Sequence, residues 1–230
     1  MADERDQIDW AEWHRGYDDP QGHLAGRLAV VRQLAAKTID LATARPPYVT
    51  SLCAGDGRDL LPVAAVSARL PRVTLVEQDP RLAEEARRQA VRLGLGDTAR
   101  VVEGDAGDLA TYVGVPPADV VLVCGVLGHL SDDDVERLAV SLPQLATAGA
   151  RVVWTRGPWA TADAGPRVEE TDDEHPAEGI RRAFAAHGLV EEDLVTPEGT
   201  DFCVGVHRLT RDPAPRPPVG RLFRFGSASG

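Results

Sequence analysis

Two glycines and a carboxylate are spaced in this chain so that they could hold a nucleoside. The segment 49–61 begins as an apolar strand pattern, turns at Gly55 and Gly57, and continues as an apolar helix pattern. Glycine has no Cβ, so the chain can turn sharply there and a flat ligand can lie against the backbone. Glu77 ends the next apolar run about 20 residues further on, the spacing of a ribose-binding acid. These features indicate an adenosine-containing ligand.

The residues around the bend restrict which adenosine derivative fits. Leu60 lies where the dinucleotide fingerprint needs glycine or alanine, and Asp56 and Asp59 put negative charge where phosphates would meet a helix N-terminus. NAD and FAD are therefore disfavoured. A P-loop is excluded because no Gly-Lys-Ser/Thr follows, and Lys37 is the only lysine in the sequence. A cationic adenosine derivative without phosphates fits better.

Four segments, 51–57, 77–78, 104–106 and 119–130, follow one another in an order that resembles the class I S-adenosylmethionine-dependent methyltransferases. The resemblance runs from about Pro47 to Leu209. In the first segment Gly55 and Gly57 match the glycine-rich motif of the family, whereas Ser51 replaces its acid and Cys53 its first glycine.

The resemblance implies S-adenosyl-L-methionine as cofactor and assigns a role to each segment. Glu77 is similar to the acid that binds both ribose hydroxyls, Gln78 to the residue beside the adenine, and Asp105 to the acid that reads the adenine amino group. The expected cofactor-binding residues are Ser51, Cys53, Ala54, Gly55, Asp56, Gly57, Glu77, Gln78, Asp105, Ala106, Cys124 and Gly125. Asp56 is equally well explained as a turn-forming residue.

The reaction implied is attack of a substrate oxygen, nitrogen, carbon or sulfur on the sulfonium methyl of the cofactor. Orientation alone can lower such a barrier by roughly 7 kcal/mol in the best cases, so no dedicated base is required. If a base takes part, His129 is the candidate, because the loop after the fourth expected strand borders the methyl group. The alternative is that His129 only packs ahead of a helix that begins near Ser131.

The acceptor site is expected from the amino-terminal segment, the loop 125–132 and the region 156–176. Trp13, His14 and Tyr17 could close over the pocket as a lid or anchor an amino-terminal helix, and Arg156 is a further candidate for substrate binding. The acidic run 169–174 is either a solvated face or a feature that favours an amine-bearing substrate. Cys53 has no paired histidine in the sequence and is interpreted as a small apolar residue.

Hydrophobic periodicity predicts an α/β fold. Strands alternate with helices, which indicates a doubly wound, mostly parallel Rossmann-like methyltransferase sheet that ends in an antiparallel hairpin, with helices on both faces. We expect strands near 49–53, 73–77, 100–103, 119–124, 151–155, 189–195 and 202–209, and helices near 9–17, 24–39, 80–93, 131 onward and 176–187. Asp79 and Ser131 are predicted helix caps.

We expect a single methyltransferase domain over 1–210, followed by a flexible tail over 211–230. Within the domain, 1–45 is a helical amino-terminal extension or lid, 47–156 the cofactor-binding half, and 157–210 the substrate-side loop, helix and terminal hairpin. The tail is rich in proline, and its closing residues Gly-Ser-Ala-Ser-Gly have no core-forming pattern.

Composition narrows the class of protein. The 230 residues are 43% hydrophobic, enough for one substantial core, and the formal net charge is -11, which disfavours nucleic acid and anionic membranes as partners. No apolar run approaches a membrane span and no signal peptide is evident, so we expect a cytoplasmic protein. Cys53, Cys124 and Cys203 lack pairing or metal-ligand spacing, and no metal site is expected.

Two other functions stay open on the sequence. The chain could be a non-catalytic binding or assembly subunit that keeps the cofactor fold without turnover, as Ser51 and Cys53 hint. It could also be a dehydrogenase, although Leu60 argues against that. The favoured partner is a small-molecule acceptor, and a homodimer is an open alternative if Trp10, Trp13 or the tail crosses to a second copy.

Overall fold

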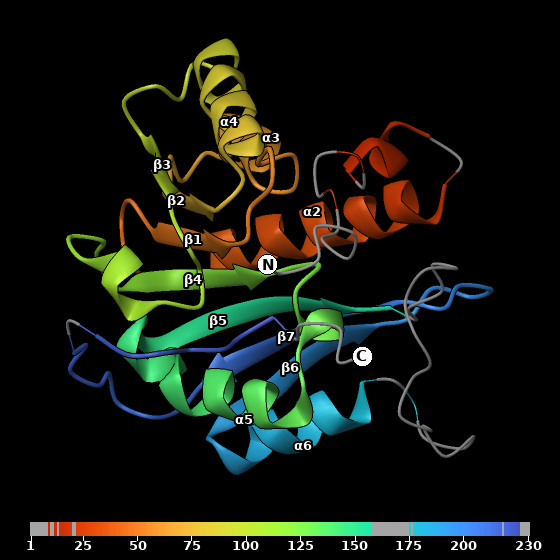
Figure 1. Ribbon diagram of the computed structural model, residues 1–230, viewed down its shortest axis with the longest axis vertical. Coiled ribbons are helices and arrows are strands. Elements are labelled where there is room, and N and C mark those ends of the chain that lie inside the picture. Colours follow the sequence, from red (N-terminus) through yellow and green to blue (C-terminus); the bar gives the residue numbers. More distant parts are fainter. Residues whose placement is uncertain are drawn as a thin grey trace, which may run out of the picture.

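The computed structural model describes residues 9, 12, 14–19, 22–157, 175, 177–217 and 219–225 (Figure 1). Its elements in chain order are η2 His14–Asp18, α2 His23–Leu41, β1 Tyr48–Leu52, α3 Leu61–Val66, β2 Arg72–Glu77, α4 Pro80–Arg92, β3 Ala99–Glu103, η3 Leu109–Tyr112, β4 Ala118–Val123, η4 Leu127–His129, α5 Asp132–Ser141, η5 Leu142–Gln144, β5 Ala146–Arg156, α6 Glu178–Ala186, β6 Leu189–Val195 and β7 Cys203–Leu209.

The seven strands form one sheet in the order β3-β2-β1-β4-β5-β7-β6. Strands β1 to β5 are parallel to one another, while β7 pairs antiparallel with both β5 and β6. The expected doubly wound sheet with a terminal antiparallel hairpin is therefore confirmed. The strand order reverses between β1 and β4, and in such folds a ligand binds at the carboxyl ends of the strands beside that switch.

Two hydrophobic clusters lie on opposite faces of the sheet. One joins the apolar stripes of α2, α3 and α4 to the sheet, and the other joins those of α5 and α6 to it. Figure 1 shows α2 along one face and α5 and α6 along the other. Both faces of the central strands are thus covered, which explains why their sequences are apolar runs without strict alternation.

The helix starts follow the expected capping chemistry. Asp79 accepts a hydrogen bond from the Arg81 N–H at 2.8 Å and Pro80 begins α4. Ser131 accepts one from the Asp134 N–H at 3.2 Å at the start of α5. Each side-chain oxygen satisfies a backbone donor that has no partner inside its helix. The predicted start points of both helices are confirmed.

The aromatic amino-terminal segment is described in part. A 3-10 helix, η2, covers His14–Asp18, where a helix near 9–17 was expected. Trp13 and the region 158–174, with its acidic run, lie outside the described residues. The division of the chain into subregions stays a prediction.

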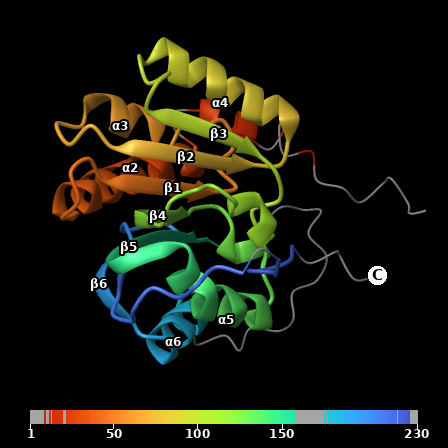
Figure 2. The same ribbon diagram turned by 90° about the vertical axis from the view of Figure 1, so that its left-hand side faces the viewer.

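The prediction of a flexible tail is wrong for residues 211–217 and 219–225. Leu222 and Phe223 have 0% exposure and belong to the core cluster that contains α5. The backbone of this segment bonds to the loop after β3: Leu222 N–H donates to the Gly107 carbonyl at 2.8 Å. Figure 2 shows the segment in blue, crossing the molecule beside α5. The side chains of Leu222 and Phe223 thus hold this irregular segment against the core, although its sequence has no periodic apolar pattern.

Candidate functional site

The predicted cofactor segments converge at the carboxyl ends of β1, β2 and β3. The Ala54 N–H donates to the Val76 carbonyl at 2.9 Å, and the Gly104 N–H donates to the Glu77 carbonyl at 2.9 Å. The loop after each strand is thus tied to the neighbouring strand. Parallel pairing puts these loops at the same edge of the sheet, as a ligand crevice requires.

Glu77 ends β2, and its carboxylate braces the glycine bend. Oε2 accepts a hydrogen bond from the Gly55 N–H at 2.7 Å, and Oε1 accepts one from the Asp79 N–H at 2.8 Å. The residue is 7% exposed. Each carboxylate oxygen has two lone pairs, so each keeps one that a ribose hydroxyl could use.

Cys53 adopts the backbone conformation of the glycine that it replaces in the family motif. Its φ is +51°, in the left-handed region, and Gly55 and Gly57 follow with φ of +57° and +75°. A side chain in this region is strained by about 1 kcal/mol or more, so the bend persists because its surroundings hold it. Burial, and then the charges of Glu77 and Asp105, raise the pKa of the Cys53 thiol well above its usual value. The thiol therefore stays protonated and lies near both acids.

Asp105 is held by the tail. Its Oδ1 accepts from the Gly107 N–H at 2.8 Å, and its Oδ2 accepts from the Arg221 guanidinium at 2.7 Å. Ala106, beside it, is 3% exposed. The acid expected to read adenine is thus part of an ion pair with a residue from the far end of the chain.

The segment η2 covers the glycine bend. A Cβ built at Gly55 would lie 2.1 Å from His14 Nε2, so the imidazole lies directly on the bare backbone of the glycine. The Tyr17 hydroxyl accepts a hydrogen bond from Arg27 at 2.8 Å, and the Arg58 guanidinium lies 5.0 Å from the Tyr17 ring centroid. His14 and Tyr17 therefore contact the cofactor motif and α2, an arrangement that fits a lid and an anchor of the amino-terminal segment equally well.

The remaining predicted cofactor residues differ in how they lie. Asp56 is 6% exposed and forms an ion pair with Arg58 at 2.5 Å. Gln78 is exposed at the end of β2. Ser51 does not reach the crevice: it is 1% exposed inside β1, and its Oγ is buried without a hydrogen-bond partner. A serine hydroxyl enclosed in β1 thus stands at the position of the first-motif acid of the family.

Asp59 lies two residues after Gly57, in the turn that leads into α3. Asp59 Oδ1 is buried and has no hydrogen-bond partner. Burial, and then the charge of Asp56, raise the pKa of Asp59 to about 7. The charge of Asp59 also raises the pKa values of Tyr17 and Cys124. From the sequence, Asp59 was expected only to repel phosphates; a buried carboxylate oxygen without a hydrogen-bond partner points to a ligand that supplies a donor.

The loop after β4 forms the other side of the site. The Gly125 N–H donates to Thr155 Oγ1 at 2.8 Å, and Gly125 has φ of +74°. Cys124 donates its thiol proton to the Val153 carbonyl at 3.8 Å. Burial, and then the charges of Arg27 and Arg156, lower the pKa of His129 to about 3. His129 is therefore uncharged at neutral pH.

Arg27 is a functional candidate that sequence reasoning missed. It is 8% exposed although it is charged. It lies at i+3 from Leu24 and i−4 from Val31, within the apolar stripe of α2, and a charge in such a stripe was the available signal. Its guanidinium lies beside the glycines that follow β4 and β5, 4.0 Å from a Cβ built at Gly125 and 3.9 Å from one built at Gly157.

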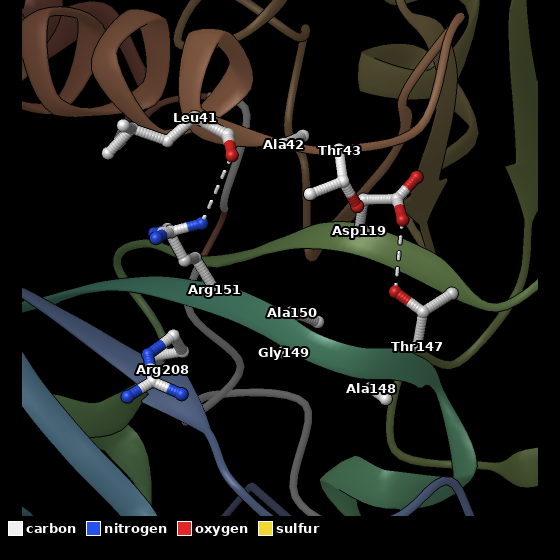
Figure 3. Close-up of a pocket in the computed structure, with 10 residues that line it drawn as sticks. All are labelled: Leu41, Ala42, Thr43, Asp119, Thr147, Ala148, Gly149, Ala150, Arg151 and Arg208. Atoms are coloured by element: carbon white, nitrogen blue, oxygen red, sulfur yellow. Dashed lines mark hydrogen bonds between the residues drawn. The ribbon is translucent and has the colours of Figure 1, made fainter.

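Two cavities lie away from the centre of this site. One of about 530 Å³ is bounded by Tyr17, Arg32, Asp56, Arg58 and Gln89, on the outer side of the glycine loop. The other, of about 240 Å³, lies at the opposite edge of the sheet, where β4 and β5 begin (Figure 3). The figure shows Asp119 bonded to Thr147 there and Arg151 directed at the Leu41 carbonyl. Only the larger cavity borders the predicted cofactor motif.

Searches by sequence return no match, neither to a family model nor to a curated protein. Solved structures do match. Magnesium protoporphyrin IX methyltransferase from Synechocystis PCC 6803, with bound SAM, has a TM-score of 0.65 at 17% identity, over 89% of this chain and 92% of that chain. The O-methyltransferase family 2 protein from Planctomyces limnophilus DSM 3776, in complex with apigenin, has a TM-score of 0.56 at 20% identity, over 80% and 59%. The pyocyanin biosynthetic protein PhzM has a TM-score of 0.55 at 15% identity, over 86% and 61%.

The chain has the class I methyltransferase fold. The first of these matches extends along nearly the whole of both chains. The glycine bend, Glu77, Asp105 and the loop after β4 follow the carboxyl ends of the parallel strands β1, β2, β3 and β4.

Two further observations concern metal ions and membranes. Among the described residues, no group of three or more His, Cys, Asp or Glu side chains is placed to hold a metal ion. No helix in the described part of the chain combines the length and the apolar character needed to cross a membrane.

Proposed function

We propose that this protein binds S-adenosyl-L-methionine and transfers its methyl group to a small-molecule acceptor. The observation that carries the proposal is the bond between Glu77 and the Gly55 N–H, because it places a carboxylate at the glycine bend of a methyltransferase fold. A structural relative with this fold was solved with bound SAM. The four segments of the sequence had already predicted the same cofactor, without knowledge of the fold.

The residues of the crevice fit the adenosine part of the cofactor. Glu77 would accept hydrogen bonds from the ribose hydroxyls with the lone pairs that its two backbone donors leave open. Asp105 and Ala106 lie one loop further on, where the adenine would lie beside the strand ends. The pair between Arg221 and Asp105 fixes the direction of that carboxylate in advance.

We infer that Asp59 is the acid that holds the amino-acid end of the cofactor. A buried carboxylate oxygen without a partner is costly unless a ligand supplies a donor, and the α-ammonium group of the cofactor is such a donor. This role would compensate for Ser51, whose hydroxyl is enclosed in β1. The amino-acid end would then lie between the glycine loop and the loop after β4.

The bound cofactor supplies an activated methyl on a sulfonium. The chain supplies position: η2 covers the glycine bend and excludes water from it, and the loop after β4 orients the acceptor. His129, the predicted base, is uncharged and can accept a hydrogen bond from an acceptor hydroxyl. A pKa of about 3 makes it a weak base, so we assign it a positioning role first and proton transfer second.

Titration calorimetry with S-adenosylmethionine and with its demethylated product S-adenosylhomocysteine tests the cofactor. Binding of both in the micromolar range supports the proposal, and binding of neither refutes it. Methyl transfer is then measured over a broad panel of small acceptors. Binding without turnover on any acceptor would favour the non-catalytic subunit, although Cys53 keeps a glycine-like φ at the bend.

A further inference from the structure

The tail crosses the loop after β3 and is fixed there by its own backbone. The Leu222 N–H donates to the Gly107 carbonyl at 2.8 Å, and the Leu109 N–H donates to the Gly220 carbonyl at 3.0 Å. A Cβ built at Gly107 would lie 2.4 Å from the Phe223 carbonyl oxygen, so the two backbones touch. These contacts are made by backbone atoms, and they do not depend on the polar side chains of the tail.

Arg221 lies in this stretch and reaches the carboxylate of Asp105. Its Nη1 donates to Asp105 Oδ2 at 2.7 Å, and the Gly107 N–H donates to Oδ1 at 2.8 Å. The Arg221 Nε is buried and has no hydrogen-bond partner among the described residues, so the bond to Asp105 sets the direction of the guanidinium. One oxygen of Asp105 is thus held by the backbone of its own loop and the other by a residue near the end of the chain.

The carboxylate of Asp105 is also accessible to a ligand. The side chain is 32% exposed, and each of its oxygens has a second lone pair beyond the one that its protein donor uses. A carboxylate that is paired with a guanidinium only accepts hydrogen bonds, so it favours a ligand group that donates them.

The place of Asp105 relative to Glu77 fits a nucleoside. Glu77 lies opposite Glu103 in the register of β2 and β3, and its carbonyl accepts a hydrogen bond from the Gly104 N–H at 2.9 Å. Asp105 follows two residues after Glu103, and neighbouring strands lie about 4.8 Å apart. A ribose bound to Glu77 would therefore have its base beside Asp105.

We propose that Arg221 is a positioning residue that makes the protein select adenine by its 6-amino group, because it holds the Asp105 carboxylate in the direction that accepts a hydrogen bond from that group. The inference rests on the proposed function and names the residue on which discrimination at the base depends. A base without the amino group leaves this fixed acceptor unpaired, and the lost hydrogen bond lowers the affinity.

Two bonds from the protein are needed to fix the carboxylate. With the Gly107 N–H alone, the group can turn about its Oδ1, whereas the bond from Arg221 at Oδ2 also fixes its plane. A side chain that is held before the ligand arrives loses less conformational entropy on binding. Replacing Arg221 therefore reduces the gain in affinity that the amino group provides and leaves the contacts of the ribose in place.

Arg224 offers a matched control on the same segment. It lies three positions after Arg221 and is exposed. Its backbone N–H donates to Asp134 Oδ1 at 3.0 Å, a bond that a substitution of the side chain leaves intact. Arg224→Gln therefore removes the same charge from the tail without changing the partner of Asp105.

The test compares S-adenosylhomocysteine with its analogue in which hydrogen replaces the 6-amino group of the base. Calorimetry on the full chain gives both affinities. We expect the wild type and Arg224→Gln to bind S-adenosylhomocysteine about tenfold or more tightly than the analogue, and Arg221→Gln to bind it at most about threefold more tightly. Asp105→Ala should bring the ratio to about one, and Arg221→Gln added to it should not change the ratio further.

The ratio compares two ligands on one protein sample, so a partial loss of folded protein affects both affinities alike. A wild-type ratio near one, a wild-type ratio retained in Arg221→Gln or in Asp105→Ala, or an equal fall in Arg224→Gln would each overturn the inference. Complete loss of S-adenosylhomocysteine binding in Arg221→Gln would overturn it as well, because the contacts of the ribose do not involve Arg221. A wild-type protein that does not bind S-adenosylhomocysteine would instead refute the proposed function itself.

Discussion

Glu77 performs two tasks that one substitution can separate. Its carboxylate orients the bend through Gly55 and Asp79, and it is the expected acceptor for the ribose hydroxyls. In Glu77→Gln one oxygen becomes an amide donor that faces a backbone N–H. We expect the affinity for S-adenosylhomocysteine to fall about 10- to 100-fold, the usual effect of losing hydrogen bonds to a charged group. Calorimetry measures it.

Glu103 offers a matched control. It ends β3, lies directly opposite Glu77 in the strand register, and is exposed beside Arg87. Glu103→Gln removes the same charge at the same edge of the sheet, and its affinity should stay within about twofold of the wild type. Equal losses in the two variants would mean that general charge, rather than the carboxylate at the bend, determines binding.

Asp59 predicts a pH dependence of cofactor binding. An ammonium group binds the ionised carboxylate, but with a pKa of about 7 much of the unliganded protein carries a proton there at neutral pH. Affinity for S-adenosylhomocysteine should therefore rise with pH up to about 7 and then level off. Below pH 7 the affinity should increase by up to about tenfold for each pH unit. Calorimetry at pH 5.5, 6.5 and 8 in two buffers of different ionisation enthalpy also detects the released proton.

The variant Asp59→Asn provides the control, because it has no proton to release at this position. Its affinity should depend less on pH than that of the wild type. The free energy of unfolding of the unliganded protein changes in the opposite sense. Because the folded pKa of Asp59 lies above the unfolded value of 3.8, this group makes the fold less stable as pH rises from about 4 to about 7. A wild-type affinity that is flat across pH 5.5 to 8 would contradict the role of Asp59.

How well the role of a single residue could be predicted depended on where it lies in the chain. Glu77, Gly55 and Asp105 come directly after strands, where spacing along the sequence translates into proximity at one edge of the sheet. Arg27 was missed although its place in the apolar stripe of α2 was a signal, whereas the burial of Asp59 Oδ1 comes from tertiary contacts that no spacing along the chain reports. Ser51 occupies the position of the motif's acid but lies inside β1, because a side chain in a strand can face either side of the sheet.

Among the elements, the strands and helices were predictable and the tail was not. Periodic segments such as α4 report their buried face through their own pattern. The segment 211–225 has no period and is held by a few contacts: the Arg216 guanidinium donates to the Tyr112 and Val115 carbonyls, and Arg221 pairs with Asp105. Such contacts depend on the folded partner and leave no trace in the local sequence.

Phe223 and Phe225 form a matched pair for testing the packed tail. Phe223 is 0% exposed and Phe225 is 37% exposed, two positions away on the same segment. We expect Phe223→Ala to lower the free energy of unfolding by about 3 kcal/mol or more, the usual effect of such a cavity. Phe225→Ala should cost about 1 kcal/mol or less. Urea denaturation followed by circular dichroism compares them, and similar values for both would indicate that the tail adds no stability.

For the molecule as a whole, alternation of strands and helices was sufficient to predict the sheet. The four motifs lie at one edge of that sheet, and a cofactor site at this edge stays a prediction. The fold is confirmed by its strand order and by solved structures at 15–20% identity. Neither a family model nor a curated protein matches the sequence, so the fold is recognised from the structure rather than from shared residues.

The net charge of -11 predicts how the salt concentration affects the rate at which the protein binds its cofactor. S-adenosylmethionine has a net positive charge and S-adenosylhomocysteine has none, so the field of the protein should accelerate association of the first alone. Raising salt from about 20 to about 200 mM should lower its association rate constant roughly two- to fivefold, and leave that of S-adenosylhomocysteine nearly constant. Stopped-flow fluorescence measures both. Equal salt dependence of the two would show that local rather than global charge governs encounter.

Residues 216–225 leave the ribosome after all seven strands, yet one of them binds Asp105 and another packs on His129. A nascent chain that has released 1–210 can already pair every strand, but its crevice lacks Arg221 and the ring of Phe225. The protein therefore binds its ligand with full affinity only after this segment has left the exit tunnel. A ribosome stalled after residue 210 has left its exit tunnel would present a paired sheet with an unfinished pocket.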